Sequence, residues 1–283
     1  MAEAPPASVA QAIRDAAEKL AKTSDTARLD AEVLMSHALG VPRSEMLVRH
    51  MADAVPSTFA MLVERRAAHE PVAYITGTQE FYGRSFIVSP DVLIPRGDSE
   101  VLVERAIAAK PDALRVFDCG TGSGALLLTC LLELPAAMGV GIDRSRAALD
   151  VARGNAAALG LGQRTSLAGA DWNLPGWSDP LGGPFDLVFA NPPYIETDAI
   201  IFPDVRDHEP HEALFAGPDG LNDYRVLIPQ VPGLLALKGI ALVEIGATQA
   251  SAVIALAEVA GLVATLHRDL AGRDRVVEMT LRR

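Results

Sequence analysis

The sequence predicts an α/β protein, in which a small helical bundle precedes a mostly parallel β-sheet covered by helices on both faces. Up to about Glu70, apolar residues recur at the spacing typical of helices. After Ala113, apolar runs of strand length alternate with helical patterns, as in parallel sheets. The chain has 283 residues, of which 49% are hydrophobic and 22% charged, so it is long enough for two globular domains.

The first helix is expected to begin after Ser8, because serine commonly caps helix N-termini. The apolar residues that recur on one of its faces are Val9, Ile13, Ala16 and Leu20. A second helix is expected from Thr26 to Leu39, since Gly40 follows as a C-terminal cap.

Two shorter helices complete the expected bundle. Pro42 and Ser44 open the third helix, and Ser57 opens the fourth. The apolar positions of the second and fourth helices are Leu29, Val33, Leu34, Phe59, Leu62 and Val63. We therefore assign residues 1–75 to an N-terminal helical domain.

Residues 76–98 are expected to form a hairpin-like connector, because from Pro71 the helical pattern stops and Gly, Pro and Ser become frequent. Its two β-prone runs are Phe86–Val88 and Val92–Ile94. A helix is expected to resume near Ser99, and residues 99–283 form the predicted α/β domain.

The α/β domain contains seven apolar runs that we interpret as strands: Val116–Cys119, Val140–Asp143, Ser166–Ala170, Phe185–Ala190, Ile240–Ile245, Val263–His267 and Val276–Leu281. The long apolar stretch from Gly124 to Ile142 resembles a membrane span. Glu133 and Pro135 interrupt it, so a buried helix followed by a buried strand is the better interpretation.

The formal net charge of −11 disfavours a protein that coats DNA or RNA, because such proteins usually present a basic face to the phosphates. The two cysteines, Cys119 and Cys130, have no disulfide or metal-ligand spacing and are expected to be buried thiols. The N-terminal stretch MAEAPPASVAQ lacks the apolar core of a signal peptide. A cytoplasmic location is therefore expected.

A glycine-rich turn follows the first strand of the α/β domain, in the sequence VFDCGTGSGALLL. Gly120, Gly122 and Gly124 alternate with Thr121 and Ser123 before a helix begins. Glycine allows positive φ angles and a close approach of the backbone to a ligand at a helix N-terminus. The turn is therefore a candidate ligand-binding loop, although its spacing differs from that of dinucleotide-binding enzymes.

Two further strand ends extend this candidate site. Asp143 ends the next strand, where a carboxylate can accept hydrogen bonds from both hydroxyls of a ribose. Asp171 and Trp172 follow the third strand and suit an adenine. The indole can stack against the adenine ring, and the carboxylate can accept a hydrogen bond from its amino group. These positions predict a ligand that contains a nucleoside.

The charge of the loop further restricts the class of ligand that it could bind. There is no Gly-x-x-x-x-Gly-Lys-Ser/Thr loop for phosphates, and no lysine or arginine follows the glycines. A loop without a cation suits a ligand that is itself positively charged. S-adenosylmethionine is such a ligand, and it becomes S-adenosylhomocysteine when it gives up its methyl group.

The fourth strand ends in FANPPYIE, which places Asn191, Pro192, Pro193 and Tyr194 at the same sheet edge. The Asn191 side-chain carbonyl and the Pro192 backbone carbonyl can accept the hydrogens of a planar NH₂ group, whose conjugated nitrogen is otherwise a poor nucleophile. The prolines stiffen the backbone, and the Tyr194 ring offers a face against which a flat group can pack. The acceptor could be adenine, guanine or a glutamine side chain.

The chain resembles the peptide chain release factor glutamine methyltransferases over nearly its whole length. The segments that carry the resemblance include RLDAEVLMSHAL, HEPVAYITGTQEFYG, VLIPRGDSEVLVE, DCGTGSGALLL, NPPYIE, EPHEALFAGPDGLNDYR, LVEIGATQ and DLAGRDRVV. The family implies a Rossmann-like class I methyltransferase domain with a mostly parallel seven-stranded sheet. It also implies transfer from S-adenosylmethionine to the glutamine of a Gly-Gly-Gln loop.

By this resemblance, the residues from Gly120 to Gly124, together with Asp143, Trp172 and Asn191, contact the methyl donor. The residues Asn191 to Tyr194 hold the acceptor glutamine, with Asn191, Pro192 and Tyr194 as the catalytic group. The N-terminal bundle docks the release factor. The enzyme is expected to act as a monomer, without a metal ion and without contact with a membrane or direct contact with nucleic acid.

Some matched residues receive no role, or differ from the family pattern. Phe81, Arg96, Glu100 and Glu244 match family segments without an assigned catalytic role. The departures are Gly97 and Ser99, where the family usually has Pro and Thr, and His211, where Arg is common. The acidic and histidine-rich stretch from Asp207 to Glu212 is interpreted as a polar loop over the site, because it lacks the His-Glu-x-x-His spacing of metal sites.

Two other functions share parts of this pattern. An amino-methyltransferase that acts on adenine or guanine of DNA or RNA would use the same Asn-Pro-Pro-Tyr loop. It should also have a basic groove and a means of extruding the base, which the acidic composition disfavours. A non-catalytic binding module would be expected to lose the glycines or the Asn-Pro-Pro-Tyr residues, and this chain keeps them.

Overall fold

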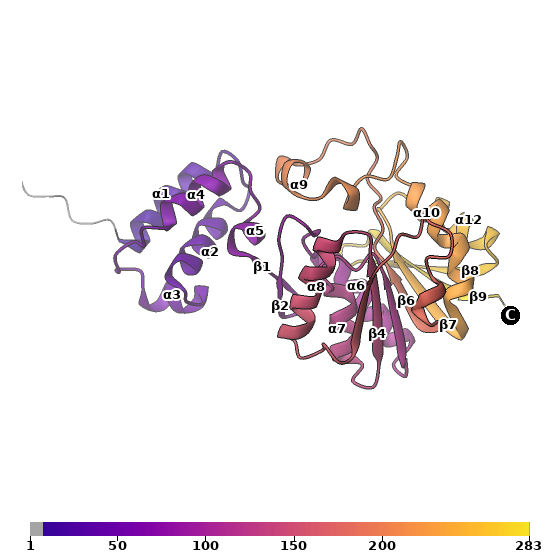
Figure 1. Cartoon of the computed structure of the whole chain (residues 1–283). Helices are drawn as coiled ribbons and strands as arrows, with labels where there is room; N and C mark the ends of the chain where they lie inside the picture. The colour runs from indigo at the N-terminus through magenta and orange to yellow at the C-terminus, as the bar shows by residue number, and fades with distance from the viewer. Residues whose placement is uncertain (1–7, 283) are drawn as a thin grey trace, which may run out of the picture. The chain divides into compact units, whose positions relative to one another are not determined.

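The computed structural model describes residues 8–282, and the chain divides into two compact units (Figure 1). The helical unit runs to Thr78 and also includes Ile201–His208, whereas the sheet unit comprises Gln79–Ile200 and Glu209–Arg283. The expectation about a signal peptide concerns mainly residues 1–7, which lie outside the described residues. Across residues 8–282, no helix combines the length and the apolar character needed to cross a membrane.

The helical unit has an apolar core made by short helices that pack around α1 and α2. The side chain of Ser8 caps α1 by accepting a hydrogen bond from the Gln11 amide, and the four apolar residues predicted for this helix are buried. Gly40 ends α2 in the left-handed conformation, as predicted. The helices are α1 (Val9–Leu20), α2 (Ala27–Leu39), α3 (Arg43–Arg49), α4 (Phe59–Ala67), α5 (Val72–Thr76) and α9 (Pro203–His208).

The buried face of α2 differs from the predicted one. Leu34 is buried as expected, but Leu29 is 46% exposed and Val33 only half-buried. The core receives Ala31 and Met35 from this helix instead. Sequence pattern was misleading here because acidic residues share the buried face, where arginines pair with them.

The predicted end of helical structure at Pro71 was wrong. Pro71 stands at the N-cap of α5, and Gly77 ends this short helix with a φ of 76°. Ile75 joins the core of the helical unit. A helix of five residues is too short to show a periodic pattern, so only its flanking Pro and Gly could have indicated it.

The sheet unit contains a seven-stranded sheet in the order β5-β4-β3-β6-β7-β9-β8. The first five strands in this order run parallel, and β9 pairs antiparallel with both β7 and β8. All seven predicted strands are confirmed, although β7 begins five residues before its predicted start. The strands are β3 (Arg115–Cys119), β4 (Met138–Asp143), β5 (Thr165–Gly169), β6 (Phe185–Ala190), β7 (Leu235–Glu244), β8 (Leu262–Arg268) and β9 (Asp274–Leu281).

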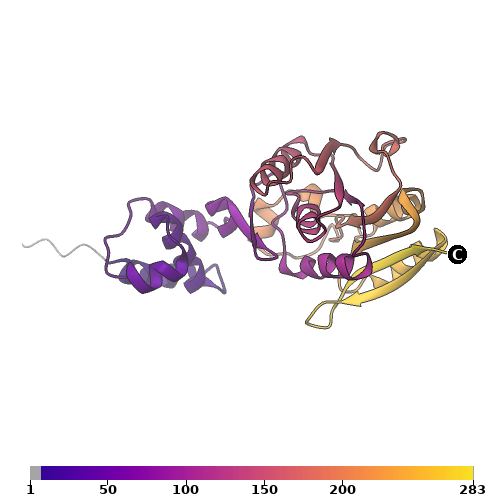
Figure 2. The same ribbon diagram turned by 90° about the horizontal axis from the view of Figure 1, so that it is seen from below.

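Both faces of this sheet are buried under helices (Figure 1; Figure 2). Alternate strand residues point to opposite faces, so Leu187 and Phe189 pack with α6 and α7, whereas Val188 and Ala190 lie in the cluster with α10 and α12. The helices of this unit are α6 (Glu100–Ala109), α7 (Ala125–Glu133), α8 (Arg146–Ala158), α10 (Asn222–Leu227), α11 (Val231–Leu234) and α12 (Ala250–Val259). The 3-10 turns are η1 (Gly97–Ser99), η2 (Asp179–Leu181), η3 (His211–Ala213) and η4 (Ile228–Gln230).

The connector forms a hairpin of β1 (Thr78–Phe81) and β2 (Arg84–Ile87). Tyr82 and Gly83 turn the chain with φ angles of 52° and 69°. Asn155 of α8 binds this hairpin, because its side chain accepts from the Ile87 amide at 2.7 Å and donates to the Ile87 carbonyl at 2.9 Å. The second predicted β-run, Val92–Ile94, is not a strand and continues as a loop.

Candidate active site

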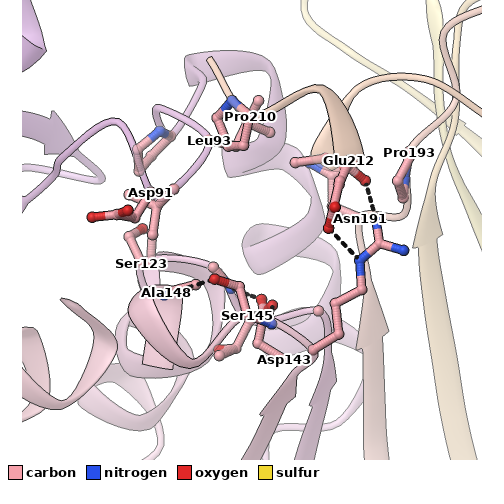
Figure 3. Close-up of a pocket in the computed structure, with 18 of the residues that line it drawn as sticks. Asp91, Leu93, Ser123, Asp143, Ser145, Ala148, Asn191, Pro193, Pro210 and Glu212 are labelled. Atoms are coloured by element: carbon pink, nitrogen blue, oxygen red, sulfur yellow. Dashed lines mark hydrogen bonds and ion pairs between the residues drawn. The ribbon is translucent and has the colours of Figure 1, made fainter. Parts of the chain in front are cut away.

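A cavity of about 430 Å³ opens at the carboxyl ends of the parallel strands (Figure 3). It lies where the strand order reverses between β3 and β6, which is the usual ligand site of open α/β sheets. The residues predicted to bind the methyl donor meet in its wall. They are Gly120, Thr121, Gly122 and Ser123 after β3, Asp143 at the end of β4, Trp172 after β5 and Asn191 after β6.

The glycine turn is held against β4 by its own backbone. The Gly120 and Thr121 amides donate to the Ile142 carbonyl at 3.0 and 2.8 Å. The Gly122 amide donates to one carboxylate oxygen of Asp143 at 2.9 Å. Gly124, the last of the three glycines, starts α7 with a φ of 82° and is not among the residues that line the cavity.

Trp172 is fixed on three sides. Its ring lies 3.2 Å from the position that a Cβ on Gly120 would take, so the missing side chain of Gly120 makes room for the indole. The indole Nε1 donates to Asp223 at 3.2 Å, and its backbone carbonyl accepts from Gln230 at 3.1 Å. The aromatic wall of the cavity is thereby held in one orientation.

The cavity has an acidic character. Asp91, Asp143 and Asp171 line it without an arginine or lysine partner within ion-pair distance among the described residues. The two lining arginines are neutralised, since Arg96 pairs with Glu209 and Arg144 pairs with Glu212. Burial raises the pKa of Asp143 above its ordinary value. This charge balance suits a cationic ligand.

The Asn-Pro-Pro-Tyr segment contributes unequally to the wall. Asn191 and Pro193 line the cavity, but Pro192 and Tyr194 do not. Gln249 holds the segment from behind by donating to the Tyr194 carbonyl at 3.0 Å. Burial also raises the pKa of the Tyr194 phenol to about 12, so the phenol stays protonated at neutral pH.

Two segments of the wall were not predicted to bind the donor. The loop Pro90–Arg96 lines one side, and the segment Pro210–Ala213 lines another (Figure 3). Both segments lie within the family-like stretches, and the second overlaps Asp207–Glu212, which was expected to form a polar loop over the site. Glu209, whose side chain is 1% exposed, joins the two segments by accepting from the Ile94 amide at 3.1 Å and pairing with Arg96.

The remaining matched residues separate into two groups. Phe81, Arg96, Ser99 and His211 line the cavity. Glu100 instead accepts from the Tyr82 amide at 2.7 Å, and Glu244 lies buried outside the lining.

The stretch from Asp207 to Glu212 also separates into two parts. Asp207 and His208 belong to α9 in the helical unit. Glu209 and Glu212 belong to the sheet unit, where each pairs with an arginine of the cavity wall. Within the sheet unit, Pro210, His211 and Glu212 line the cavity, as expected for a polar loop at the site.

Comparison with known proteins gives matches to both parts of the chain. Residues 11–77 match the family described as PrmC N-terminal domain, and residues 110–219 match a methyltransferase domain. A release factor glutamine methyltransferase of Bradyrhizobium diazoefficiens is 42% identical over 89% of this chain and 88% of its own length. The enzyme of the same description from Caulobacter vibrioides is 43% identical over 89% of both chains.

A solved structure agrees with the fold of the sheet unit. The ribosomal protein L11 methylase of Lactobacillus delbrueckii subsp. bulgaricus superposes with a TM-score of 0.50 at 21% identity, covering 72% of this chain and 90% of that one. The predicted class I methyltransferase fold is confirmed, and the chain is an S-adenosylmethionine-dependent methyltransferase. From its match to these relatives over almost its whole length, the chain belongs to the release factor glutamine methyltransferase family.

Proposed function

We propose that this enzyme transfers a methyl group from S-adenosylmethionine to the side-chain amide nitrogen of the glutamine in the Gly-Gly-Gln loop of class I peptide chain release factors. The observation that carries the proposal is the position of Asn191, whose amide lines the same cavity as the glycine turn and Trp172. An acceptor held by Asn191 would therefore lie beside the bound donor. The family relatives supply the identity of the acceptor.

The residues of the cavity fit the proposed donor. Asp143 already accepts from Gly122 and Ser145, and its remaining lone pairs would accept from the ribose hydroxyls. Trp172 would stack on the adenine, and Asp171 would accept from its amino group. The donor, when bound, supplies a methyl group on a positively charged sulfur, which the acidic wall favours.

The acceptor side would depend on the Asn-Pro-Pro-Tyr segment. The Asn191 side-chain carbonyl and the Pro192 backbone carbonyl would accept the two hydrogens of the glutamine amide, while Pro193 and Tyr194 keep the segment rigid. Holding a poor nucleophile in line in this way can lower the activation free energy by up to roughly 7–11 kcal/mol relative to the free reactants. The nitrogen becomes strongly acidic once it is alkylated, so the proton can leave to solvent without a dedicated base.

We further propose the domain roles that the sequence predicted. Residues 99–283 would carry out the chemistry, and the helical domain of residues 1–75 would bind the release factor. The enzyme would act as a monomer.

The test uses labelled S-adenosylmethionine and two release factors, one native and one with the Gly-Gly-Gln glutamine changed to alanine. Label is expected on the native factor alone, and Asn191→Ala should reduce it about 100-fold or more. Asn222→Ala, at an asparagine outside the cavity wall, serves as the matched control and should keep full transfer. Label on ribosomal RNA or DNA instead of the native factor would refute the proposal and favour a nucleic-acid acceptor.

A further inference from the structure

Asp223 lies outside the cavity wall but hydrogen-bonds to a residue that forms it. Its Oδ1 atom accepts from the indole Nε1 of Trp172 at 3.2 Å. This nitrogen is the one polar atom of the indole, and it can only donate. Asp223 belongs to α10 and Trp172 follows β5, so the hydrogen bond joins two segments that are 51 positions apart in the chain.

The indole of Trp172 is held at opposite ends of its ring system. Its Cζ3 and Cη2 atoms, in the six-membered ring, lie 3.2 Å from the position that a Cβ on Gly120 would take. Nε1, in the five-membered ring, is held by Asp223. Rotation of a tryptophan ring about its Cβ–Cγ bond meets only a shallow barrier, so packing at one end does not fix the angle. The hydrogen bond to Asp223 supplies the second constraint.

The main chain of Trp172 is held by the same part of the molecule. Gln230 of η4 donates to the Trp172 carbonyl at 3.1 Å and to the Val226 carbonyl at 2.8 Å. The side-chain carbonyl of Gln230 accepts from the Trp177 indole at 2.5 Å. Gln230 therefore fixes the backbone of Trp172, and Asp223 fixes its ring.

The helix that carries Asp223 is anchored in the core of the sheet unit. Tyr224, the next residue, is fully buried and donates its hydroxyl to the Glu244 backbone carbonyl at 2.9 Å. Leu227 belongs to the apolar cluster on this face of the sheet, and Trp172 packs against the same cluster. The position of Asp223 is therefore set by the core and does not depend on a ligand in the cavity.

A purely structural role explains this hydrogen bond poorly. Asp223 and Trp172 are both only half-buried, so water can replace either partner at little cost to the fold. The cavity wall would change more, because the ring of Trp172 would lose one of its two constraints.

We propose that Asp223 is a positioning residue for the methyl donor, which holds the indole of Trp172 in the orientation that stacks on the adenine. This role rests on the proposed function, in which Trp172 is the aromatic wall of the donor site. Asp223 touches neither reactant, because it lies outside the lining of the cavity. Its loss should therefore weaken donor binding and leave the fold intact.

The first experiment measures the Kd for S-adenosylhomocysteine by titration calorimetry. Asp223→Ala should weaken binding about fivefold, because one hydrogen bond to the wall is lost. Asp223→Asn keeps an acceptor oxygen without the charge and should stay within about twofold of the native value. Asp219→Ala is the matched control, since it removes a carboxylate whose ion-pair partner Arg225 lies on the same helix, and it should bind as the native protein does.

Nuclear magnetic resonance reports on the ring itself. The chain has two tryptophans, so its indole N–H groups give two resonances, which Trp172→Phe assigns. Asp223→Ala should move the Trp172 indole proton upfield, because hydrogen bonding deshields a proton. The Trp177 resonance should stay in place, since Trp177 donates to Gln230. Adding Asp223→Ala to Trp172→Phe, which lacks Nε1, should weaken binding no further.

The outcomes separate this role from the proposed function. Absence of label on the release factor, with native binding of S-adenosylhomocysteine, would overturn the proposed acceptor alone, because the calorimetry does not depend on it. Native affinity in Asp223→Ala, or an equal loss of affinity in Asp223→Asn, would overturn the positioning role. Should Asp223→Ala fail to fold, Asp223→Leu removes the same acceptor with a side chain of similar shape, and native affinity in that variant would refute the role.

Discussion

Gly120 carries a constraint that only glycine satisfies without strain. Its φ is +77°, and a Cβ there would stand 3.2 Å from the ring of Trp172. Gly120→Ala should therefore push the indole out of the cavity wall and weaken S-adenosylhomocysteine binding about 10-fold or more, as measured by titration calorimetry. The strained backbone should also cost about 1 kcal/mol of stability.

Gly160 separates these two effects. Its φ is +71°, but nothing lies within 4 Å of its added Cβ. Gly160→Ala should show the same backbone strain with unchanged donor affinity. Equal losses of affinity in the two variants would mean that strain, and not the contact with Trp172, is responsible.

Asp118 should make stability depend on pH. Burial raises the pKa of its carboxyl to about 7, although Thr121 donates to it at 2.8 Å. Because the folded pKa exceeds the unfolded value, its stabilisation is complete below the unfolded pKa and is lost as the pH rises through about 7. The melting temperature of Asp118→Asn minus that of the native protein should rise between about pH 5 and pH 8; a constant or falling difference would contradict this assignment.

At the scale of single elements, α9 depends on one buried cation. Arg66, whose side chain is 7% exposed, pairs with Asp30 at 2.7 Å and reaches Asp204 of α9 at 3.2 Å, all within the helical unit. Asp204→Asn should speed amide exchange across residues 203–208 about fivefold, corresponding to about 1 kcal/mol, as measured by mass spectrometry.

The matched control is Asp207→Asn on the same helix. Asp207 is an exposed carboxylate that forms an ion pair with the adjacent Arg206. It should leave exchange in α9 nearly unchanged. Similar acceleration in both variants would show that net charge, and not the link to Arg66, stabilises the helix.

The elements differ in how far the sequence could predict them. The strands of the sheet were found because burial on both faces gives them continuous apolar runs, as in Phe185–Ala190. The helix α5 and the strand β1 were missed, since five and four residues are too few to show a period. The loop Pro90–Arg96 contains the β-prone run Val92–Ile94 but forms no strand. Its place in the cavity wall depends on tertiary contacts such as that of Glu209 with the Ile94 amide.

At the scale of the whole molecule, each unit has its own apolar core. One cluster belongs to the helical unit, and two others lie on the faces of the sheet. Stabilisation by S-adenosylhomocysteine, about 2.7 kcal/mol at 100 times its Kd, should therefore remain within the sheet unit. Hydrogen exchange should slow around residues 120–123, 143–145 and 191–193 and remain unchanged in α1 and α2; equal slowing in α1 and α2 would contradict this independence.

The division of the chain was the part of the molecule least accessible to sequence reasoning. The N-terminal family region matches residues 11–77, and the domain boundary near residue 75 stays a prediction. The return of residues 201–208 to the helical unit was not predicted, because Arg66 and Asp204 are separated by 138 positions. No local pattern can indicate an ion pair at that separation.

Because residues 201–208 belong to the helical unit, the way in which such enzymes can be recombined is restricted. A chimaera that joined the first 78 residues of one relative to the remainder of another would mix two halves of one folding unit, because α9 would come from the wrong parent. Arg66 would then face a foreign sequence in place of Asp204. Exchange of the helical unit between relatives should therefore succeed only when both segments are transferred together. Substitutions in α4 and α9 should also be correlated among relatives.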